Sequence, residues 1–188
     1  QPLGKLNAHH GSYIVTGNHE YYSGADEWIE EFRRLGLQPL LNEHVVIDHH
    51  GAHLIIAGIN DYSAISRDPA ETSSELHGSD PVKALDGSPE KTPKILLAHQ
   101  PRSAQSAVEA GFDLQISGHT HGGQFWPWNL FVRIYQPYTE GLHRLGNLWI
   151  YVSRGTGYWG PPKRFWVPSE ITLIRLWPVK GLNNSSLC

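Results

Sequence analysis

The 188-residue sequence contains one cysteine, no methionine and a formal net charge of only −3. A single cysteine cannot close an intramolecular disulfide or supply the thiolates of a structural zinc site. The small negative charge gives the molecule no overall electrostatic attraction to nucleic acid. We therefore expect no nucleic-acid partner.

Long hydrophobic runs are also missing. No apolar stretch approaches the roughly 20 residues that span a bilayer, and no signal-peptide pattern opens the sequence. Membrane association is expected only through a segment upstream of residue 1, so localisation is left open. Because the sequence lacks methionine altogether, we expect that it does not begin where translation begins. We expect a fragment, an isoform or a processed product of a longer protein.

Histidine is the residue present in excess, with 12 copies in a chain that is 39% hydrophobic and 18% charged. That hydrophobic and charged balance is ordinary for a globular protein and favours one domain, or most of a larger one. Imidazole is the commonest metal ligand and the usual acid–base group near neutral pH. The composition therefore directs attention to metal binding or acid–base chemistry.

Apolar periodicity predicts a mixed α/β fold. Trp28, Ile29, Phe32 and Leu35 recur at helical spacing and predict a helix over residues 23–35, and a second helix is expected over 103–110. Short apolar runs predict strands at 12–16, 45–47, 54–57, 94–98, 114–117, 148–153 and 171–176.

The domain is expected to occupy residues 1–178, followed by a tail over 179–188. Residues 61–93 are rich in Ser, Pro, Asp and Glu and have few apolar anchors. We expect them to form a long insertion on the surface.

Three polar clusters directly follow predicted strands: "TGNHE" at 16–20, "LLAHQP" at 96–101 and "SGHTHGG" at 117–123. Loops at strand ends are where α/β proteins usually hold catalytic and binding residues. In extended backbone, residues two apart share a face, so His119 and His121 are expected to enter one cavity. The neighbouring glycines would relieve the backbone where it crowds a ligand. Taken singly, His99 would be a hydrogen-bonded structural residue, but the combination favours a common site.

In this order, "GNHE", a lone histidine after a strand, and "GHTH" resemble the calcineurin-like metallophosphoesterases, and most closely a membrane-tethered branch of that family. The resemblance covers about residues 12–176. It implies an α/β fold, a β-sandwich flanked by helices in four αββα layers, here lacking its N-terminal strands. It also implies metal-dependent hydrolysis of a phosphate ester whose identity the sequence does not fix.

The same resemblance implies a role for each site residue. Asn18, His99 and His119 would bind one metal ion, and His121 would bind a second. His19 would protonate the leaving oxygen or stabilise the transition state, and Glu20 would orient His19. Two divalent ions, zinc, manganese or iron, suit this ligand set in the complete domain.

Two further family motifs, D-x-H and G-D-x-x-D, are not found in the seventeen residues before Asn18. "DHH" at 48–50 matches the first by spelling, but it follows "GNHE" in a predicted hairpin turn and is assigned to chance. We therefore expect at most one weakly held ion and an isolated chain that is inactive. The alternative is a truncated, non-catalytic form that binds a metal or a protein partner.

Two aromatic segments are less specific. "SRGTGYWGPPKRFW" at 153–166 contains Arg154 and Arg164, which are weak candidates for binding the substrate phosphate. The preferred interpretation is a loop whose aromatic side chains cover the sheet. "FWPWNLF" at 125–131 is interpreted as a buried or interfacial aromatic loop, with a membrane-facing role as the less favoured alternative.

Overall fold

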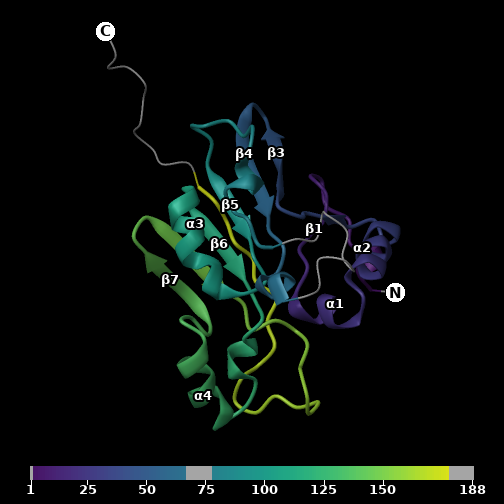
Figure 1. Cartoon of the computed structure of the whole chain (residues 1–188), viewed down its shortest axis with the longest axis vertical. Coiled ribbons are helices and arrows are strands. Elements are labelled where there is room, and N and C mark those ends of the chain that lie inside the picture. Colours follow the sequence, from purple (N-terminus) through teal and green to yellow (C-terminus); the bar gives the residue numbers. More distant parts are fainter. Residues whose placement is uncertain (1, 67–77, 178–188) are drawn as a thin grey trace.

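The computed structural model describes residues 2–66 and 78–177 (Figure 1). The predicted tail over 179–188 and residues 67–77 of the predicted insertion lie outside the described residues. The predicted mixed α/β class is confirmed.

A six-stranded sheet forms the centre of the molecule. Its strands in spatial order are β3 (Glu43–His49), β4 (Ala52–Gly58), β5 (Lys94–Leu97), β6 (Leu114–Ser117), β8 (Leu148–Val152) and β7 (Gly141–Leu145). The four inner strands run parallel to one another, and β3 and β7 pair antiparallel at the two edges. The parallel strands therefore end at one edge of the sheet.

The edge strand β3 joins β4 through the predicted hairpin turn at "DHHG". His50 and Gly51 adopt positive φ angles of 56° and 82°. The Gly51 N–H donates to the Asp48 carboxylate at 3.0 Å, which closes the turn. The turn assignment of this D-x-H sequence is thus confirmed.

The helices are α1 (Asn18–Ser23), α2 (Ala25–Arg34), α3 (Ala104–Ala110) and α4 (Trp128–Tyr135). The predicted helix over 23–35 corresponds to α2, which buries Ile29 and Phe32. Gly24, at φ 96°, separates α2 from α1. A two-stranded parallel sheet, β1 (Tyr13–Ile14) and β2 (Gln38–Pro39), lies beside these two helices at one side of the large sheet (Figure 1).

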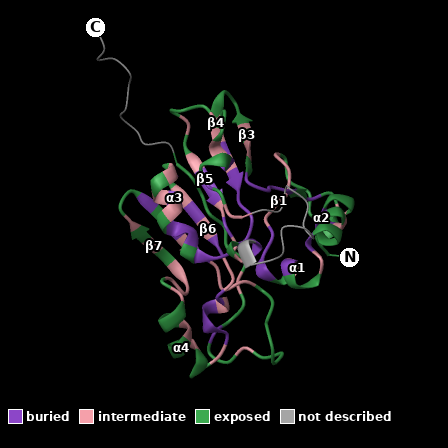
Figure 2. Cartoon of the chain, viewed as in Figure 1, coloured by how far each residue is buried: buried purple, intermediate pink, exposed green. Residues whose placement is uncertain are grey.

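The core lies between the large sheet and α3, where Figure 2 shows buried strands beneath a partly exposed helix. Leu96 of β5 and Ile150 of β8 are fully buried, and α3 contributes Ala104 and Ala107 to the same cluster. Ala84, from the predicted surface insertion, is also fully buried there. The described part of that insertion is therefore anchored at several points, since Asp61 and Ala64 are buried as well.

Some expectations are wrong. Residues 171–176, predicted as a strand, form no regular element, because a strand needs a neighbouring backbone and none of the described strands pairs with them. The loop expected over 125–131 is partly helical, since α4 begins at Trp128. The expected central sheet with flanking helices is confirmed, and the second sheet among the described residues is the short β1–β2 pair.

Truncation of the central strand tests this core. Leu96→Ala removes a fully buried side chain and should lower the free energy of unfolding by about 2–5 kcal/mol. The matched control Leu142→Ala, on the edge strand β7 where the side chain is 60% exposed, should change it by no more than about 0.5 kcal/mol. Urea unfolding measures both. Equal losses in the two variants would contradict the assigned core.

Candidate metal centre and active site

Polar loops from the inner strands meet at the edge where those strands end. Asp61 follows β4, His99 follows β5, His119 follows β6 and Arg154 follows β8. Backbone hydrogen bonds continue past the strands, from Gly118 N–H to the His99 carbonyl at 3.0 Å and from Ser153 N–H to the Ser117 carbonyl at 2.8 Å. The sheet therefore holds these loops in fixed register, as is usual for sites in parallel sheets.

Three side chains far apart in sequence converge at this edge. The Asn18 Oδ1 atom lies 3.0 Å from His99 Nε2 and 3.2 Å from His119 Nδ1, and these two nitrogens lie 3.1 Å apart. Asn18 is buried at the start of α1. Gly17 makes room for the cluster, because a Cβ atom there would lie 2.9 Å from the His99 ring.

The chemistry of this triangle fits a cation. Each neutral imidazole nitrogen either donates one proton or presents one lone pair, and the amide oxygen only accepts. Hydrogen bonds can therefore satisfy at most two of the three short contacts. A divalent ion would satisfy all three, and bonds of about 2.0–2.1 Å would separate neighbouring donor atoms by about 2.8–3.4 Å, from octahedral to tetrahedral angles.

The imidazoles of this cluster are held neutral. Burial, reinforced by the neighbouring imidazole of His119, lowers the pKa of His99 to about 4. Burial likewise lowers the pKa values of His119 and His121. Neutral imidazole is the form that binds metal ions.

Asp61 is a carboxylate that the sequence analysis missed. It is almost fully buried and accepts hydrogen bonds from the Gln100 amide at 2.9 and 3.1 Å and from the Ser63 N–H at 2.8 Å. Its negative charge raises the pKa values of His99 and His119, opposing the effect of burial. The cluster is thus not surrounded by neutral groups alone. The only sequence signal was an acidic residue shortly after the predicted strand at 54–57.

His19 and Glu20, adjacent on α1, lie in different environments. His19 is exposed and lines the cavity described below. The Glu20 carboxylate accepts a hydrogen bond from the Gly17 N–H at 2.6 Å, which caps the start of the helix. The described bond of Glu20 is therefore structural, and its orienting effect on His19 stays a prediction.

The turn after β6 differs from the extended conformation expected there. His119, His121 and Gln124 have φ angles of 67°, 51° and 60°, values that cost non-glycine residues about 1 kcal/mol or more each. His119 and His121 still line the same cavity, but through a strained left-handed turn rather than by strand alternation. The prediction that strand alternation turns both histidines to one face was therefore wrong.

The glycines of this turn lie where other segments of the chain pack closely against it. A Cβ atom on Gly122 would lie 2.8 Å from the Arg154 side chain, and one on Gly123 would collide with Asn129 of α4. Both glycines also have positive φ angles. Their role in this structure is close approach between chain segments, rather than the room for a ligand that we expected.

His121 is set apart from the Asn18–His99–His119 triangle. Arg164 Nη2 donates to His121 Nδ1 at 3.1 Å, because a guanidinium group can only donate. The His121 proton is then on Nε2, and the positive charge of Arg164 adds to burial in lowering the pKa of His121. This contact disfavours a cation at His121 as it is oriented here.

The two arginine candidates are occupied by internal contacts. Arg154 pairs with Glu170 at 2.6 Å, and Arg164 donates to the backbone carbonyls of Arg154 and Gly157 at 2.7 and 2.6 Å. They stabilise the loop over residues 153–170. Their role in binding a substrate phosphate stays a prediction.

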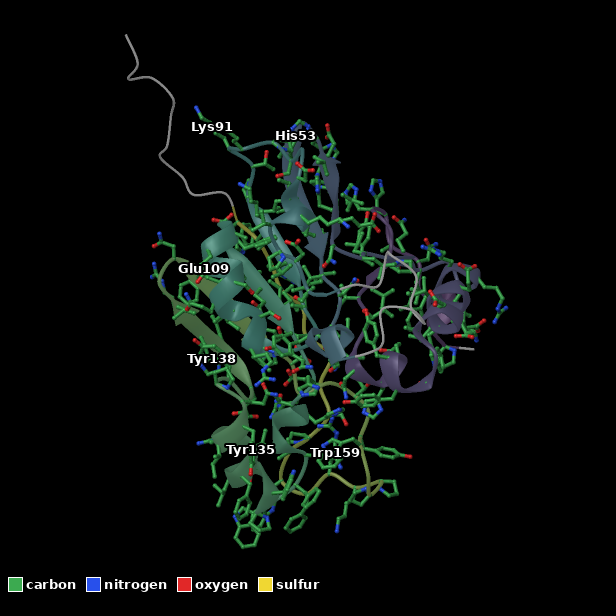
Figure 3. All side chains as sticks on the ribbon, viewed as in Figure 1. His53, Lys91, Glu109, Tyr135, Tyr138 and Trp159 are labelled. Atoms are coloured by element: carbon green, nitrogen blue, oxygen red, sulfur yellow. The ribbon has the colours of Figure 1, made fainter. Side chains whose placement is uncertain are left out.

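A cavity of about 290 Å³ opens beside the triangle and has one polar and one largely apolar wall. Its lining residues are Asn18, His19, His119, Thr120, His121, Trp128, Val132, Tyr135, Gln136 and Trp159. In Figure 3, Tyr135 extends from α4 and Trp159 from the facing loop. The predicted residues Asn18, His19, His119 and His121 thus share one cavity, and His99 joins it through its contacts with Asn18 and His119.

The site thus brings two imidazole nitrogens and an amide oxygen, donor types that metal centres use, together at the ends of parallel strands. Residues 1–123 match the model of the calcineurin-like phosphoesterases. The chain therefore belongs to the calcineurin-like phosphoesterase family.

Relatives support the same assignment. The chain is 41% identical over 179 residues to an uncharacterized metallophosphoesterase of Helicobacter pylori strain J99, covering 94% of this chain and 45% of the relative. It is 40% identical over 185 residues to the bovine (Bos taurus) transmembrane protein with metallophosphoesterase domain, covering 93% of this chain and 40% of that protein. The chain thus spans less than half the length of these relatives.

A solved structure supports the fold alone. The sulfate thiohydrolase SoxB of Thermus thermophilus, in complex with glycerol, superposes with a TM-score of 0.50 at 19% identity. The match covers 75% of this chain and 27% of SoxB.

The neutral triangle predicts a specific pH response in the metal-free protein. The ordinary pKa of histidine, 6.5, applies to the unfolded chain, whereas His99 in the folded chain titrates near 4. As the pH falls from 6.5 to 4, the unfolded state takes up the proton first, so the contribution of His99 to stability is present above pH 6.5 and is lost over this range. Imidazole NMR should show His99 neutral at pH 5.5.

Two variants sharpen that measurement. Asp61→Asn removes a charge that favours the imidazolium form, so it should lower the pKa of His99 further. His53→Gln, on the distant β3–β4 hairpin, should leave it unchanged. A titration of His99 near 6.5 would refute the buried neutral assignment.

Proposed function

We propose that this protein hydrolyses phosphate esters with the help of a divalent cation bound by Asn18, His99 and His119. The observation that carries the proposal is the triangle of donor atoms, with sides of 3.0–3.2 Å, beside a cavity. Membership of the calcineurin-like phosphoesterases supports the reaction class.

The residues would contribute to hydrolysis in distinct ways. A bound divalent ion supplies Lewis acidity, which offsets charge on the phosphate oxygens and eases deprotonation of water. Asn18 adds a neutral oxygen ligand, and the buried Asp61 adds negative charge nearby without belonging to the triangle. Together they would hold a dication without overcharging the site.

His19 is proposed as the proton donor to the leaving oxygen. Its side chain is exposed to the cavity and lies next to Asn18 in sequence, so a phosphate beside the triangle would be within its reach. Imidazole is the side chain that most often serves as a general acid in enzymes. Glu20 would act mainly through the helix start that it caps.

A second metal ion, as in the expected dinuclear centre, stays a prediction. Among residues 2–66 and 78–177, no group of three or more His, Cys, Asp or Glu side chains is arranged to hold an ion. His121 lies in the cavity, but Arg164 contacts it. We propose one weakly bound ion for the described residues. In the non-catalytic alternative, the chain binds one metal ion or a protein partner. That alternative also allows the bound ion, so only a measurement of turnover distinguishes it from catalysis.

We also propose that the protein acts at a membrane. The bovine relative and one from Danio rerio are named as transmembrane proteins with a metallophosphoesterase domain. In the part of the chain that the structure describes, no helix is long and apolar enough to cross a bilayer. Attachment would depend on other segments of the protein, and the substrate's identity stays open.

Substitution of His19 and His99 tests the proposal in the longest natural form of the protein. Binding of Zn²⁺ or Mn²⁺ is measured by calorimetry, and turnover with bis(4-nitrophenyl) phosphate. His19→Ala should lower kcat by about 10²–10⁴-fold and leave the cation affinity unchanged. His99→Ala should abolish cation binding at this site and turnover with it.

His53→Ala is the matched control, because His53 lies on the β3–β4 hairpin at the far end of the molecule from the cavity (Figure 3). It should leave both readings unchanged. Unaltered turnover in His19→Ala would remove His19 from the mechanism. Normal cation binding in His99→Ala would overturn the triangle as the metal site. A bound ion without turnover would favour the non-catalytic alternative.

A further inference from the structure

An unusual apolar surface surrounds the cavity. Two segments, residues 125–135 and 158–166, together form what we call the aromatic lobe, which projects from the sheet around α4 (Figure 1). Its exposed large hydrophobic residues are Trp126, Trp128, Leu130, Phe131, Ile134, Tyr135, Tyr158, Trp159, Phe165 and Trp166. Ile134, Tyr135 and Trp166 each expose about three-quarters of their surface, at 74%, 74% and 75%.

These side chains stand on an ordered base. The buried Gln124 donates to the carbonyls of Trp159 and Pro161 at 2.8 and 3.1 Å and accepts from the Trp159 N–H at 2.7 Å, which ties the two segments together. Phe165 stacks on Trp166 with ring centroids 4.7 Å apart. Helix α4 buries no residue of its own. The lobe is therefore a fixed surface, and the described residues do not cover it.

The charge of this region is of one sign. Residues 121–139 and 154–169 contain no Asp or Glu, whereas they contain Arg133, Arg154, Lys163 and Arg164. Arg154 is paired with Glu170, and Lys163 lies over the Phe125 ring at 5.3 Å. Glu140 and Glu170 border these segments at 3.8 and 2.6 Å from Arg154 and offset its charge. Arg133, Lys163 and Arg164 therefore supply the excess positive charge of this apolar surface in a chain with a net charge of −3.

We propose that the aromatic lobe docks on the interfacial region of an anionic lipid bilayer. Trp and Tyr, with an apolar ring and a polar group, are the residues that settle at the headgroup level, and Lys and Arg bind anionic lipids there. Large apolar patches of this kind mark interaction sites. A protein partner would have to supply acidic groups around an aromatic groove, whereas an anionic bilayer supplies both features over the whole surface.

Docking would also define how substrate reaches the site, a step that rests on the proposed function. Trp128, Tyr135 and Trp159 belong both to the lobe and to the cavity wall, opposite His19 and His119. A lobe seated among lipid headgroups would bring the mouth of the cavity to the depth of their phosphates. The favoured substrate class is therefore a phosphate ester in a lipid headgroup, with its apolar part against the aromatic wall.

Vesicle cosedimentation of the 188-residue chain tests the docking. Vesicles of phosphatidylcholine with phosphatidylserine should bind the chain, and vesicles of phosphatidylcholine alone should bind it more weakly. The double variant Ile134→Ser with Trp166→Ser removes apolar surface outside the cavity and should weaken binding by about tenfold or more. Leu142→Ser with Ile171→Ser, exposed hydrophobic residues outside the lobe, should bind as the wild type does.

Other results would overturn the proposal. Absence of binding to either vesicle, or binding unaffected by the lobe variant, would do so. Concentration-dependent self-association that the lobe variant abolishes, measured by sedimentation velocity without lipid, would assign the surface to a second copy instead. Turnover of bis(4-nitrophenyl) phosphate by the longest natural form of the protein separates the two proposals, because the isolated chain is expected to be inactive. Vesicle binding by the chain without ester hydrolysis by that longer form would refute the enzymatic proposal and leave docking standing.

Discussion

The convergence of Asn18, His99 and His119 on one point is the constraint on which the site depends. Two imidazole nitrogens and an amide oxygen, 3.0–3.2 Å apart, cannot all be satisfied by hydrogen bonds among themselves. The parallel sheet fixes two of these residues, because β5 and β6 end side by side. The third is fixed by α1, whose start is capped by Glu20. The fold thus imposes an arrangement that a cation would relieve.

Burial and strain maintain that arrangement. Burial keeps the imidazoles neutral, and the carboxylate of Asp61 limits how far their pKa values fall. The turn at 119–124 holds three non-glycine residues at positive φ, which only tight packing can stabilise. Gly123 lets α4 pack closely against this turn, and the Gln124 side chain donates a hydrogen bond to Trp159 of the aromatic lobe. The Asn18–His99–His119 triangle and the aromatic lobe therefore share one structural support.

Sequence alone predicted the parts of this structure that depend on local pattern. The strands that precede His99 and His119, the helix that buries Ile29 and Phe32, and the grouping of the site histidines all followed from apolar runs and motif spacing. Asp61 could not be predicted, because its importance comes from burial beside residues distant in sequence. The strand predicted at 171–176 is wrong for a related reason, because a run of apolar residues does not show whether a partner strand lies beside it. The left-handed turn at 119–124 was not predicted, because glycine is the only residue type whose presence indicates a positive φ angle, and His119, His121 and Gln124 are not glycines.

The nitrogen atoms that Zn²⁺ contacts would test the central claim most directly. The protein is labelled with nitrogen-15 in its histidine rings and titrated with Zn²⁺. Nitrogen NMR then distinguishes the Nδ1 and Nε2 atoms of each ring. If the triangle binds the ion, the first equivalent should perturb Nε2 of His99 and Nδ1 of His119. The exposed pair His10 and His49, whose facing nitrogens also lie 3.0 Å apart, should respond only later. Zinc that perturbs His10 and His49 first, with His99 and His119 unchanged, would contradict the account.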